Sequence, residues 1–316
     1  MKALSSSPSV QWIEVDLEHA GQRIDNFLCA HLKGVPRSHV YRILRTGEVR
    51  RNGGRVQAQE RLAAGDRIRL PPLRLAERAP GLAPPEALRA RLEVRILFED
   101  DELLALNKPA GMAVHGGSGV SLGVIEALRE LRPRARTLEL VHRLDRDTSG
   151  CLVIAKRRTA LLALHEQFRG PGVEKVYLAL LTGRWAHRRA LVDAPLQKNV
   201  LVSGERVVKV AREGKPARTE FRRRECYAAA TLVEARPITG RTHQIRVHAQ
   251  RLGHPVAGDE RYGDERANRE FRRFGLGRLF LHAARLTLRH PRSGEPLRLE
   301  APLDPELHHV LTLLPR

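Results

Sequence analysis

The segment 141–150 combines the residue types most able to do chemistry in this chain. It joins two short apolar runs that predict buried strands, and it holds two carboxylates, Asp145 and Asp147, beside Arg143 and Arg146. A loop that only reverses the chain needs no such charges, whereas loops at clefts often carry them. The residue types alone allow two interpretations. One is a turn whose carboxylates form surface ion pairs, and the other is a carboxylate held ionised by arginine at the floor of a cleft.

The charge of the chain indicates a polyanionic partner. Its 316 residues include 56 Lys or Arg against 36 Asp or Glu, a formal net charge of +20. An excess of this size favours nucleic acid as the partner, ahead of an acidic membrane surface. Arginine dominates the basic residues, and it suits RNA because its planar fork binds phosphate bidentately and stacks on bases.

Cysteine usage and hydropathy predict a cytoplasmic protein with no membrane association. Cys29, Cys151 and Cys226 have no paired spacing. We therefore expect them to pack in the core of a protein from a reducing compartment, rather than to form disulfides or bind metal. No apolar run approaches the length of a membrane span, and residues 1–9 lack the apolar core of a signal peptide.

The chain is expected to contain two domains. Residues 1–20 are predicted to be a disordered, Ser-rich tail with a lead-in strand, 21–75 a small module of helices and hairpins, 76–91 a Pro-rich linker, and 92–316 a larger domain. The module holds twelve Lys or Arg against four Asp or Glu, and this one-sided excess indicates phosphate binding. In the larger domain strands come in runs with few helices between them, which predicts an α+β fold with a largely antiparallel or mixed sheet.

Several local patterns give more specific expectations. Ser38 and Thr159 are predicted to cap helices, and a third helix is predicted to begin at Arg241. The basic segment 198–216 is expected to be a long loop or an exposed hairpin. The Gly-rich run 115–119 lacks the Gly-Lys-Ser/Thr ending of a nucleotide-binding loop, so a flexible turn is the better interpretation.

Four motifs occur together in a fixed order. They are Asn107-Lys108-Pro109, His142-Arg143-Leu144-Asp145, Lys175-Val176-Tyr177 and the run from Gly240 to His248. The set resembles the RsuA/RluA family of RNA pseudouridine synthases, and residues 21–75 resemble an S4 RNA-binding domain of the αL type. Residues 35–45 and 198–206 are similar to family members that modify several uridines of large-subunit (23S) ribosomal RNA. The resemblance implies a mixed, largely antiparallel sheet with flanking helices and a central cleft.

The chemistry implied by the resemblance needs no cofactor and no metal. Uracil leaves C1′ of its ribose, turns, and rejoins through C5, after the nucleotide has been flipped out of the RNA. By resemblance Asp145 is the carboxylate that acts at C1′, as in glycoside hydrolysis, and Arg246 is its ion-pair partner. Tyr177 is the active-site tyrosine that stacks on uracil or moves a proton. A covalent adduct at C1′, addition to C6 and an elimination all remain open as routes.

The resemblance also implies residues that bind the RNA. Arg143 is expected to fill the space that the flipped nucleotide leaves. The other implied substrate-binding residues are His142, His243, Gln244 and Ile245, and the implied RNA-binding residues of the S4 domain are Arg37, Arg42, Arg45 and Arg50. From residue types alone, His142 and His243 could simply orient their loops by hydrogen bonds. The spacing of His243 and His248 is poor for two metal ligands on one helix face, so we expect no metal site.

Two other functions are compatible with parts of the sequence. One is a non-catalytic RNA-binding or ribosome-assembly protein that keeps the S4 domain, and the other is a nuclease that uses Asp145 and Asp147 as a metal pair. Tritium release from C5-labelled uridine separates the first from a synthase, and sensitivity to a chelator separates the second. We expect a monomer whose substrate is large-subunit ribosomal RNA, free or in an assembling particle.

Overall fold

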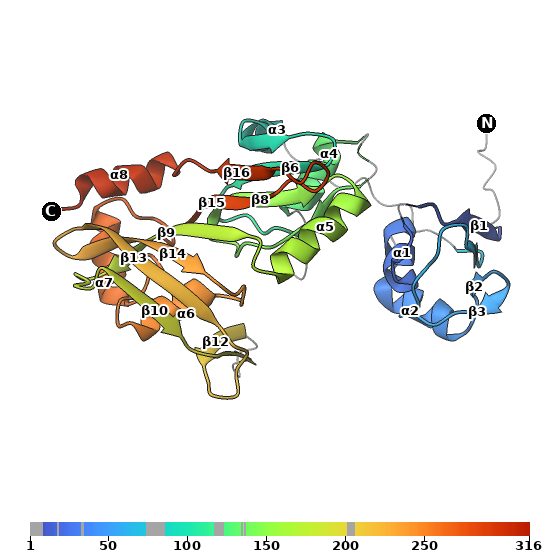
Figure 1. Ribbon diagram of the computed structural model, residues 1–316, viewed down its shortest axis with the longest axis horizontal. Coiled ribbons are helices and arrows are strands. Elements are labelled where there is room, and N and C mark those ends of the chain that lie inside the picture. The colour runs from blue at the N-terminus through green and yellow to red at the C-terminus, as the bar shows by residue number, and fades with distance from the viewer. Residues whose placement is uncertain are drawn as a thin grey trace, which may run out of the picture. The chain divides into compact units, whose positions relative to one another are not determined.

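The computed structural model describes residues 9–17, 19–32, 35–73, 86–116, 123–133, 135, 137–200 and 206–316. The chain forms two compact units, Met1–Ala83 and Pro84–Arg316, whose elements are labelled in Figure 1. Residues 1–8 of the predicted tail and residues 76–85 of the predicted linker lie outside the described residues. Within the described ranges, no helix has both the length and the apolar character that crossing a membrane requires.

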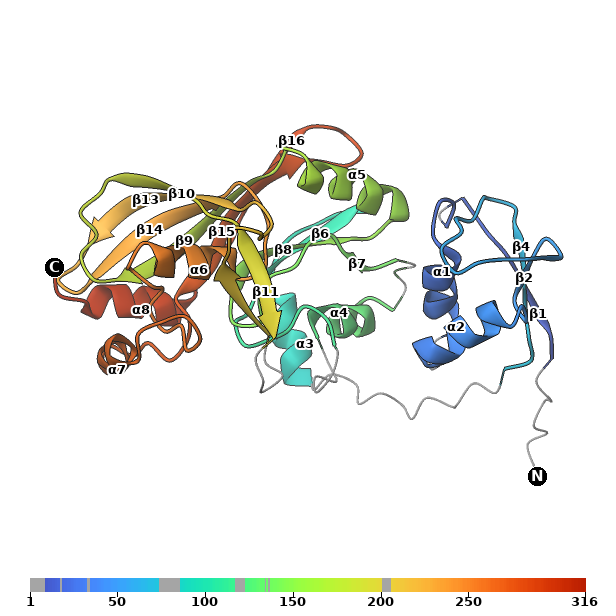
Figure 2. The ribbon, with the colours of Figure 1, turned by 90° about the horizontal axis from the view of Figure 1, so that it is seen from below.

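The first unit packs two helices on one face of a four-stranded sheet, as Figure 2 shows. In sheet order the strands are β1 (Gln11–Glu14), β4 (Arg67–Leu70), β2 (Arg50–Arg51) and β3 (Gly54–Arg55), and the helices are α1 (Ile24–His31) and α2 (Arg37–Arg45). The turn between β2 and β3 has positive φ at Asn52 and Gly53, the conformation that the Asn-Gly pair predicts. Helix α2 begins two residues earlier than expected. Pro36 occupies the N-cap position and Ser38 lies inside the first turn, so the predicted Ser38 cap is wrong.

The second unit is built on a ten-stranded mixed sheet in the order β10-β13-β14-β9-β15-β8-β6-β5, with β16 paired to β15 and β7 to β8. Among the described strands, the only parallel pair is β15 with β8. The elements are α3 (Glu86–Glu93), β5 (Ile96–Glu99), β6 (Leu103–Lys108), α4 (Val124–Leu131), β7 (Glu139–Leu140), β8 (Ser149–Ala155), α5 (Arg158–Arg169), β9 (Glu174–Thr182), β10 (Arg189–Asp193), β11 (Leu196–Val200), β12 (Arg206–Val210), β13 (Arg218–Cys226), β14 (Ala230–Pro237), α6 (Gln244–Arg251), α7 (Glu265–Arg273), β15 (Leu281–Arg289), β16 (Pro296–Glu300) and α8 (Pro305–Leu313). The predicted α+β class with a mixed, largely antiparallel sheet is confirmed.

Strands β6 and β8 are covered on both of their faces. Val153 and Ala155 pack with α5, while Leu152 and Ile154, which alternate with them, pack with α4. Figure 2 shows these two helices on opposite sides of the two strands. A strand buried on both faces needs apolar residues at every position, which is why 151–155 is a continuous apolar run. The loop before β8 is therefore attached to a strand that is buried along its whole length.

Three further local expectations differ from the structure. Residues 86–91 belong to helix α3 rather than to an extended linker, because 86–93 contains no Gly or Pro and Leu92 is fully buried. Helix α5 has Arg157 at its N-cap and no side-chain capping bond, so the predicted Thr159 cap is wrong. Helix α6 begins at Gln244 rather than at Arg241, because His243 has a left-handed backbone conformation that interrupts the helix.

The two polar loops singled out in the sequence have defined structures where they are described. The basic segment is a hairpin, since β11 pairs with β12 to form a separate two-stranded sheet. In the Gly-rich run only His115 and Gly116 are described. The amides of Gly116 and Gly123 both donate hydrogen bonds to Glu126, at 3.0 and 2.9 Å. Of the glycines in this run, the described one, Gly116, therefore has its amide bound by a carboxylate of α4.

Candidate active site

A cleft of about 860 Å³ in the second unit brings the predicted residues together. It is lined by the loop before β8, the end of α5, the strand β9 and the segment that leads from β14 into α6. The lining includes every residue predicted to be catalytic or substrate-binding, namely Asp145, Tyr177, Arg246, Arg143, His142, His243, Gln244 and Ile245. A cleft of this size is typical of a small-molecule or nucleoside site.

Asp145 lies close to two nitrogen-bearing side chains of the β14–α6 segment. Its Oδ2 is 3.7 Å from Nη1 of Arg246 and 3.9 Å from Nε2 of His243. The side chain is 30% exposed, so the carboxylate is accessible from the cleft. This is the geometry of a carboxylate beside a guanidinium in a cleft, rather than that of a turn residue on the surface.

Arg246 is held in place by a second carboxylate, Asp259, which sequence reasoning missed. Nε and Nη2 of Arg246 each donate a hydrogen bond of 2.7 Å to Asp259, and the guanidinium lies 4.9 Å from the ring centre of Tyr262. Burial alone would lower the pKa of Arg246, but Asp259 raises it above the usual value. The bidentate pair fixes two of the three guanidinium nitrogens, which leaves Nη1 directed at Asp145.

The same buried pair explains the charge state of Asp259. Burial would raise the pKa of Asp259, but Arg246 and the backbone N–H groups of Tyr262 and Arg261 hold it below the usual value. The sequence offers one signal for this group. Asp259 and Tyr262 stand between Gly258 and Gly263, and such a polar cluster bounded by glycines indicates a tight loop. Nothing in the spacing shows that this loop packs against α6.

His243, the residue that precedes α6, lies beside Asp145. Its backbone has φ of 53°, a left-handed conformation that is uncommon for a residue with a side chain. Nδ1 lies 2.7 Å from the hydroxyl of Tyr262, and that hydroxyl oxygen accepts a hydrogen bond from the N–H of Val208. Nδ1 is thus engaged by Tyr262, and Nε2 is the ring nitrogen that faces Asp145. Burial lowers the pKa of His243, which favours the neutral ring.

Tyr177 lies on β9, between Ala235 of β14 and Ala283 of β15. Burial, and then the charge of Asp145, raises the pKa of its hydroxyl above the usual value. The phenol is therefore protonated at neutral pH. A neutral ring in this position can stack on a base, and its hydroxyl can donate a proton.

Two predicted substrate-binding side chains use their hydrogen-bonding capacity within the protein. Gln244 accepts from the Thr239 hydroxyl and the Arg241 N–H and donates to the Arg218 carbonyl and the Thr219 hydroxyl. All four positions of the amide are occupied, so it can position the loop but has no donor or acceptor left for a substrate.

His142 is likewise engaged by the protein. Its Nε2 accepts a hydrogen bond of 3.0 Å from the N–H of Val153, and its ring stacks on Phe168 with 4.8 Å between ring centres. Burial lowers the pKa of His142 to about 3. Ile245 is buried against the strands beneath the cleft, whereas Arg143 is exposed at the cleft.

Lys108 ties the Asp145 loop to the turn that follows β6. Its side chain is fully buried, and Nζ donates to the carbonyls of Pro109, Met112 and Arg146 at 2.8, 2.8 and 3.0 Å. The pKa of Lys108 is lowered to about 7 by burial, against the opposing charges of Asp147 and Asp145. Three carbonyl acceptors need three N–H donors, so this contact geometry favours the protonated ammonium.

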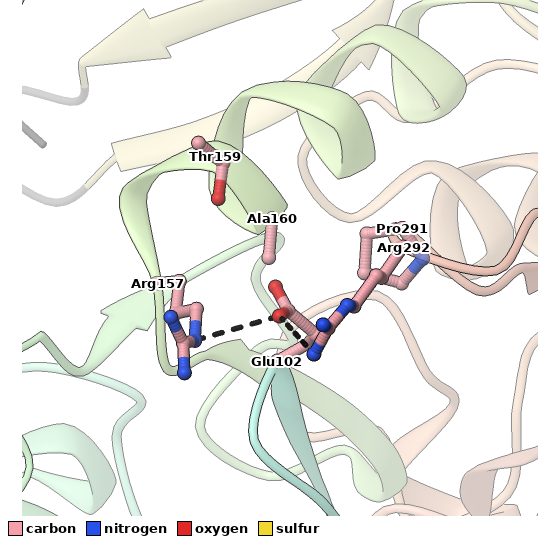
Figure 3. A pocket seen from close by; sticks show the side chains of 6 residues that line it. All are labelled: Glu102, Arg157, Thr159, Ala160, Pro291 and Arg292. Carbon is pink, nitrogen blue, oxygen red and sulfur yellow. Dashed lines mark ion pairs between the residues drawn. The ribbon is translucent and has the colours of Figure 1, made fainter. Parts of the chain in front are cut away.

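A second hollow of about 430 Å³ lacks these features. There the carboxylate of Glu102 lies 3.4 Å from Arg157 and 3.9 Å from Arg292, as Figure 3 shows. Both cations already neutralise Glu102, which indicates a structural ion pair. In the described part of the chain there is also no group of three or more His, Cys, Asp or Glu that could hold a metal ion, so Asp145 and Asp147 belong to none.

The predicted RNA-binding arginines lie in the first unit. Arg37, Arg42 and Arg45 are exposed on α2, and Arg50 lies on β2. Two of them, Arg42 and Arg45, are in the last turn of the helix, away from the buried face formed by Val40, Ile43 and Leu44.

Two protein-family models match the chain. The model described as RNA pseudouridylate synthase covers residues 102–251, which include the cleft residues, and the S4 domain model covers residues 22–68. The chain belongs to the RNA pseudouridylate synthase family and is therefore an isomerase. The family resemblance inferred from the four motifs is confirmed.

Similar proteins narrow the assignment within that family. The chain is 57% identical over 311 residues to "Ribosomal large subunit pseudouridine synthase C" of Yersinia pestis, covering 98% of this chain and 97% of that protein. It is 56% identical over 313 residues to the protein of the same name from Escherichia coli (strain K12), covering 98% of each. Among solved structures, Human RNA Pseudouridylate Synthase Domain Containing 4 has a TM-score of 0.59 and 29% identity, covering 72% of this chain and 95% of that one.

Proposed function

We propose that the protein converts uridine to pseudouridine at several positions of large-subunit (23S) ribosomal RNA, with Asp145 acting at C1′ of the ribose. The observation that carries the proposal is the Asp145 carboxylate, held beside Arg246 in a cleft large enough for a nucleoside. The substrate is supported by the similar proteins, whose printed name is ribosomal large subunit pseudouridine synthase C. The S4 domain supplies a separate RNA-binding unit.

In the proposed reaction the Asp145 carboxylate acts while the uracil leaves C1′. It attacks C1′ or stabilises the positive charge that develops there, and Arg246 lies beside it as its ion-pair partner. Tyr177 stacks on the uracil while it turns and is positioned to exchange a proton through its hydroxyl. No electrons and no atoms are gained or lost, so the reaction as written needs no cofactor and no metal.

The target nucleotide enters the cleft by flipping, at a cost of roughly a few kcal/mol in lost stacking. Arg143 is exposed at the cleft, and we assign it to the space that the nucleotide vacates. Ile245 contributes apolar surface beneath the base. His142 and Gln244 hold the loops, because their polar atoms are occupied by the protein. His243 directs its Nε2 toward Asp145.

RNA outside the cleft is bound by Arg37, Arg42, Arg45 and Arg50 of the S4 domain. The protein acts as a monomer in the cytoplasm, on large-subunit RNA that is free or in an assembling particle. The large positive charge of the chain supports a polyanionic substrate.

Tritium release from C5-labelled uridine in unmodified 23S RNA tests the proposal. The purified protein should release tritium with and without a chelator, and it should leave the RNA uncut. Asp145→Asn should abolish release while RNA affinity stays within a few-fold, because its charge serves the chemistry rather than docking. A protein that binds this RNA but releases no tritium would instead be the RNA-binding protein without an activity, and RNA cleavage that a chelator stops would favour the nuclease.

A further inference from the structure

The first unit carries a row of one tryptophan and three arginines across its sheet. In the strand registers Trp12 pairs with Arg69, Arg69 with Arg50, and Arg50 with Arg55. Residues directly opposite each other in paired strands project from the same face of a sheet. The four side chains, called here the Trp12 row, therefore extend across all four strands on one face.

This face is the one that the helices leave uncovered. Ile68 and Leu70 of β4 are buried in the core with α1 and α2, whereas Arg67 and Arg69, which alternate with them, point the other way. Figure 2 shows both helices on the opposite side of the strands. Trp12 is 51% exposed, and Arg67 places its guanidinium carbon 5.2 Å from the centre of the Trp12 ring.

The arginines on this face carry charges that the described protein does not neutralise. Within the ranges that the structure covers, no carboxylate lies within ion-pair distance of Arg50, Arg55, Arg67 or Arg69. The neighbouring Arg51 differs, since its side chain projects from the other face and forms an ion pair of 2.8 Å with Asp66. Glu14, opposite Arg67, is the one acidic residue among the strand residues that share this face. A surplus of positive charge thus surrounds an exposed aromatic ring.

We infer that the Trp12 row, together with Arg67, binds a single-stranded segment of RNA, with one base stacked on Trp12 and the neighbouring phosphates on the arginines. Proteins that bind single strands combine an aromatic ring for base stacking with a basic track for the backbone. Arg67 can cover only one of the two ring faces, and a cation over the ring is compatible with a base on the other face. The inference rests on the proposed function for the identity of the polyanion. It adds a binding face distinct from the arginines of α2.

The test uses the full chain and a short oligocytidylate, which contains no uridine to isomerise. Anisotropy of the labelled oligonucleotide gives the affinity. Trp12→Leu should weaken binding by about 5- to 100-fold without changing its salt dependence, because base stacking is lost and no charge is removed. Trp12→Phe keeps an aromatic ring and should restore most of the affinity. Arg67→Gln should lower the slope of log affinity against log salt by about one.

Fluorescence gives a second readout of the same contact. The chain has two tryptophans, and Trp185 is only 2% exposed. In a Trp185→Phe background the emission reports Trp12, and oligocytidylate should quench it. The inference would be overturned if Trp12→Leu left the affinity unchanged or if oligocytidylate did not quench the emission. Equal quenching by polyglutamate would also overturn it, because an acidic protein would then be an equally good partner.

Failure of this inference can be distinguished from failure of the proposed function. A protein that releases tritium from 23S RNA but shows no Trp12 response refutes only this inference. A protein whose Trp12 is quenched by oligocytidylate but that releases no tritium refutes only the proposed function, because Trp12 lies in the S4 unit and the oligonucleotide cannot react.

Discussion

Replacing Asp259 by asparagine should impair both stability and catalysis, although the two side chains have nearly the same shape. The four groups that contact the carboxylate are all donors, namely Nε and Nη2 of Arg246 and the backbone N–H groups of Arg261 and Tyr262. Oδ1 accepts three of these bonds and Oδ2 accepts one. The side-chain amide of the Asp259→Asn variant would therefore keep its oxygen at the Oδ1 position and turn its NH₂ group toward Nε–H of Arg246.

The variant leaves a buried guanidinium without its counter-charge. The Asp259 side chain has no exposure and that of Arg246 has 9%, and breaking such a buried pair costs about 3–5 kcal/mol. A domain stability of about 5–15 kcal/mol would still leave a folded protein at low temperature. Once Nε is released, Arg246 no longer holds Nη1 at 3.7 Å from Asp145. A misplacement of about 1 Å can cost about a hundredfold in rate, so we expect kcat to fall by about ten- to a hundredfold with little change in KM.

Urea unfolding and tritium release, both measured at a temperature where the variant is folded, separate the two effects. The matched control is Glu99→Gln. Glu99 is likewise an ion-paired carboxylate, with Arg132 and Lys156 as its partners, but it does not line the cleft. The control should lose stability and keep kcat within about twofold, since a partly buried ion pair affects folding alone. If Asp259→Asn lost stability while kcat stayed at the wild-type value, Asp259 would not position Arg246 for catalysis.

Four further variants probe other contacts. Lys108→Met removes the donor from three buried carbonyls and should lower kcat by about tenfold or more, measured by tritium release, with RNA affinity unchanged. The pKa of His142 is about 3 in the folded protein and 6.5 otherwise, so its contribution to stability is present above pH 6.5 and is lost as the pH falls toward 3. Urea unfolding at pH 7 and pH 5 should therefore show a smaller loss for His142→Phe than for the wild type, and equal losses would contradict the neutral, buried ring. Arg42→Gln and Arg45→Gln should each reduce the salt slope of 23S RNA binding by about one, and an unaltered slope would remove that arginine from the interface.

Sequence patterns correctly predicted those elements that depend only on residues close together in the chain. The Asn52-Gly53 turn and the apolar run of β8 required only knowledge of neighbouring residues. Strand β13 was missed because one of its faces is covered with arginines, which leaves only Thr219 and Phe221 fully buried. Helix α3 was missed because prolines precede it in the chain. They dominate the composition of the segment that was predicted to be a linker.

The site was predictable in its residue types and less so in its hydrogen bonding. Motif order singled out Asp145, Tyr177 and Arg246, all of which line one cleft. It could not reveal that Gln244 has every donor and acceptor occupied, because that depends on Thr219 and Arg218 of another strand. Asp259 was missed for the same reason, since only tertiary packing brings its loop against α6.

The order of the strands has a consequence for the timing of synthesis. Strand β15 lies between β8, which follows the Asp145 loop, and β9, which carries Tyr177. Leu281, the first residue of β15, comes 104 residues after Tyr177 in the chain. A nascent polypeptide that has not yet emerged as far as β15 can form two separate half-sheets but cannot join them. The ribosome must therefore translate most of this protein before the cleft that Asp145 and Tyr177 line can assemble.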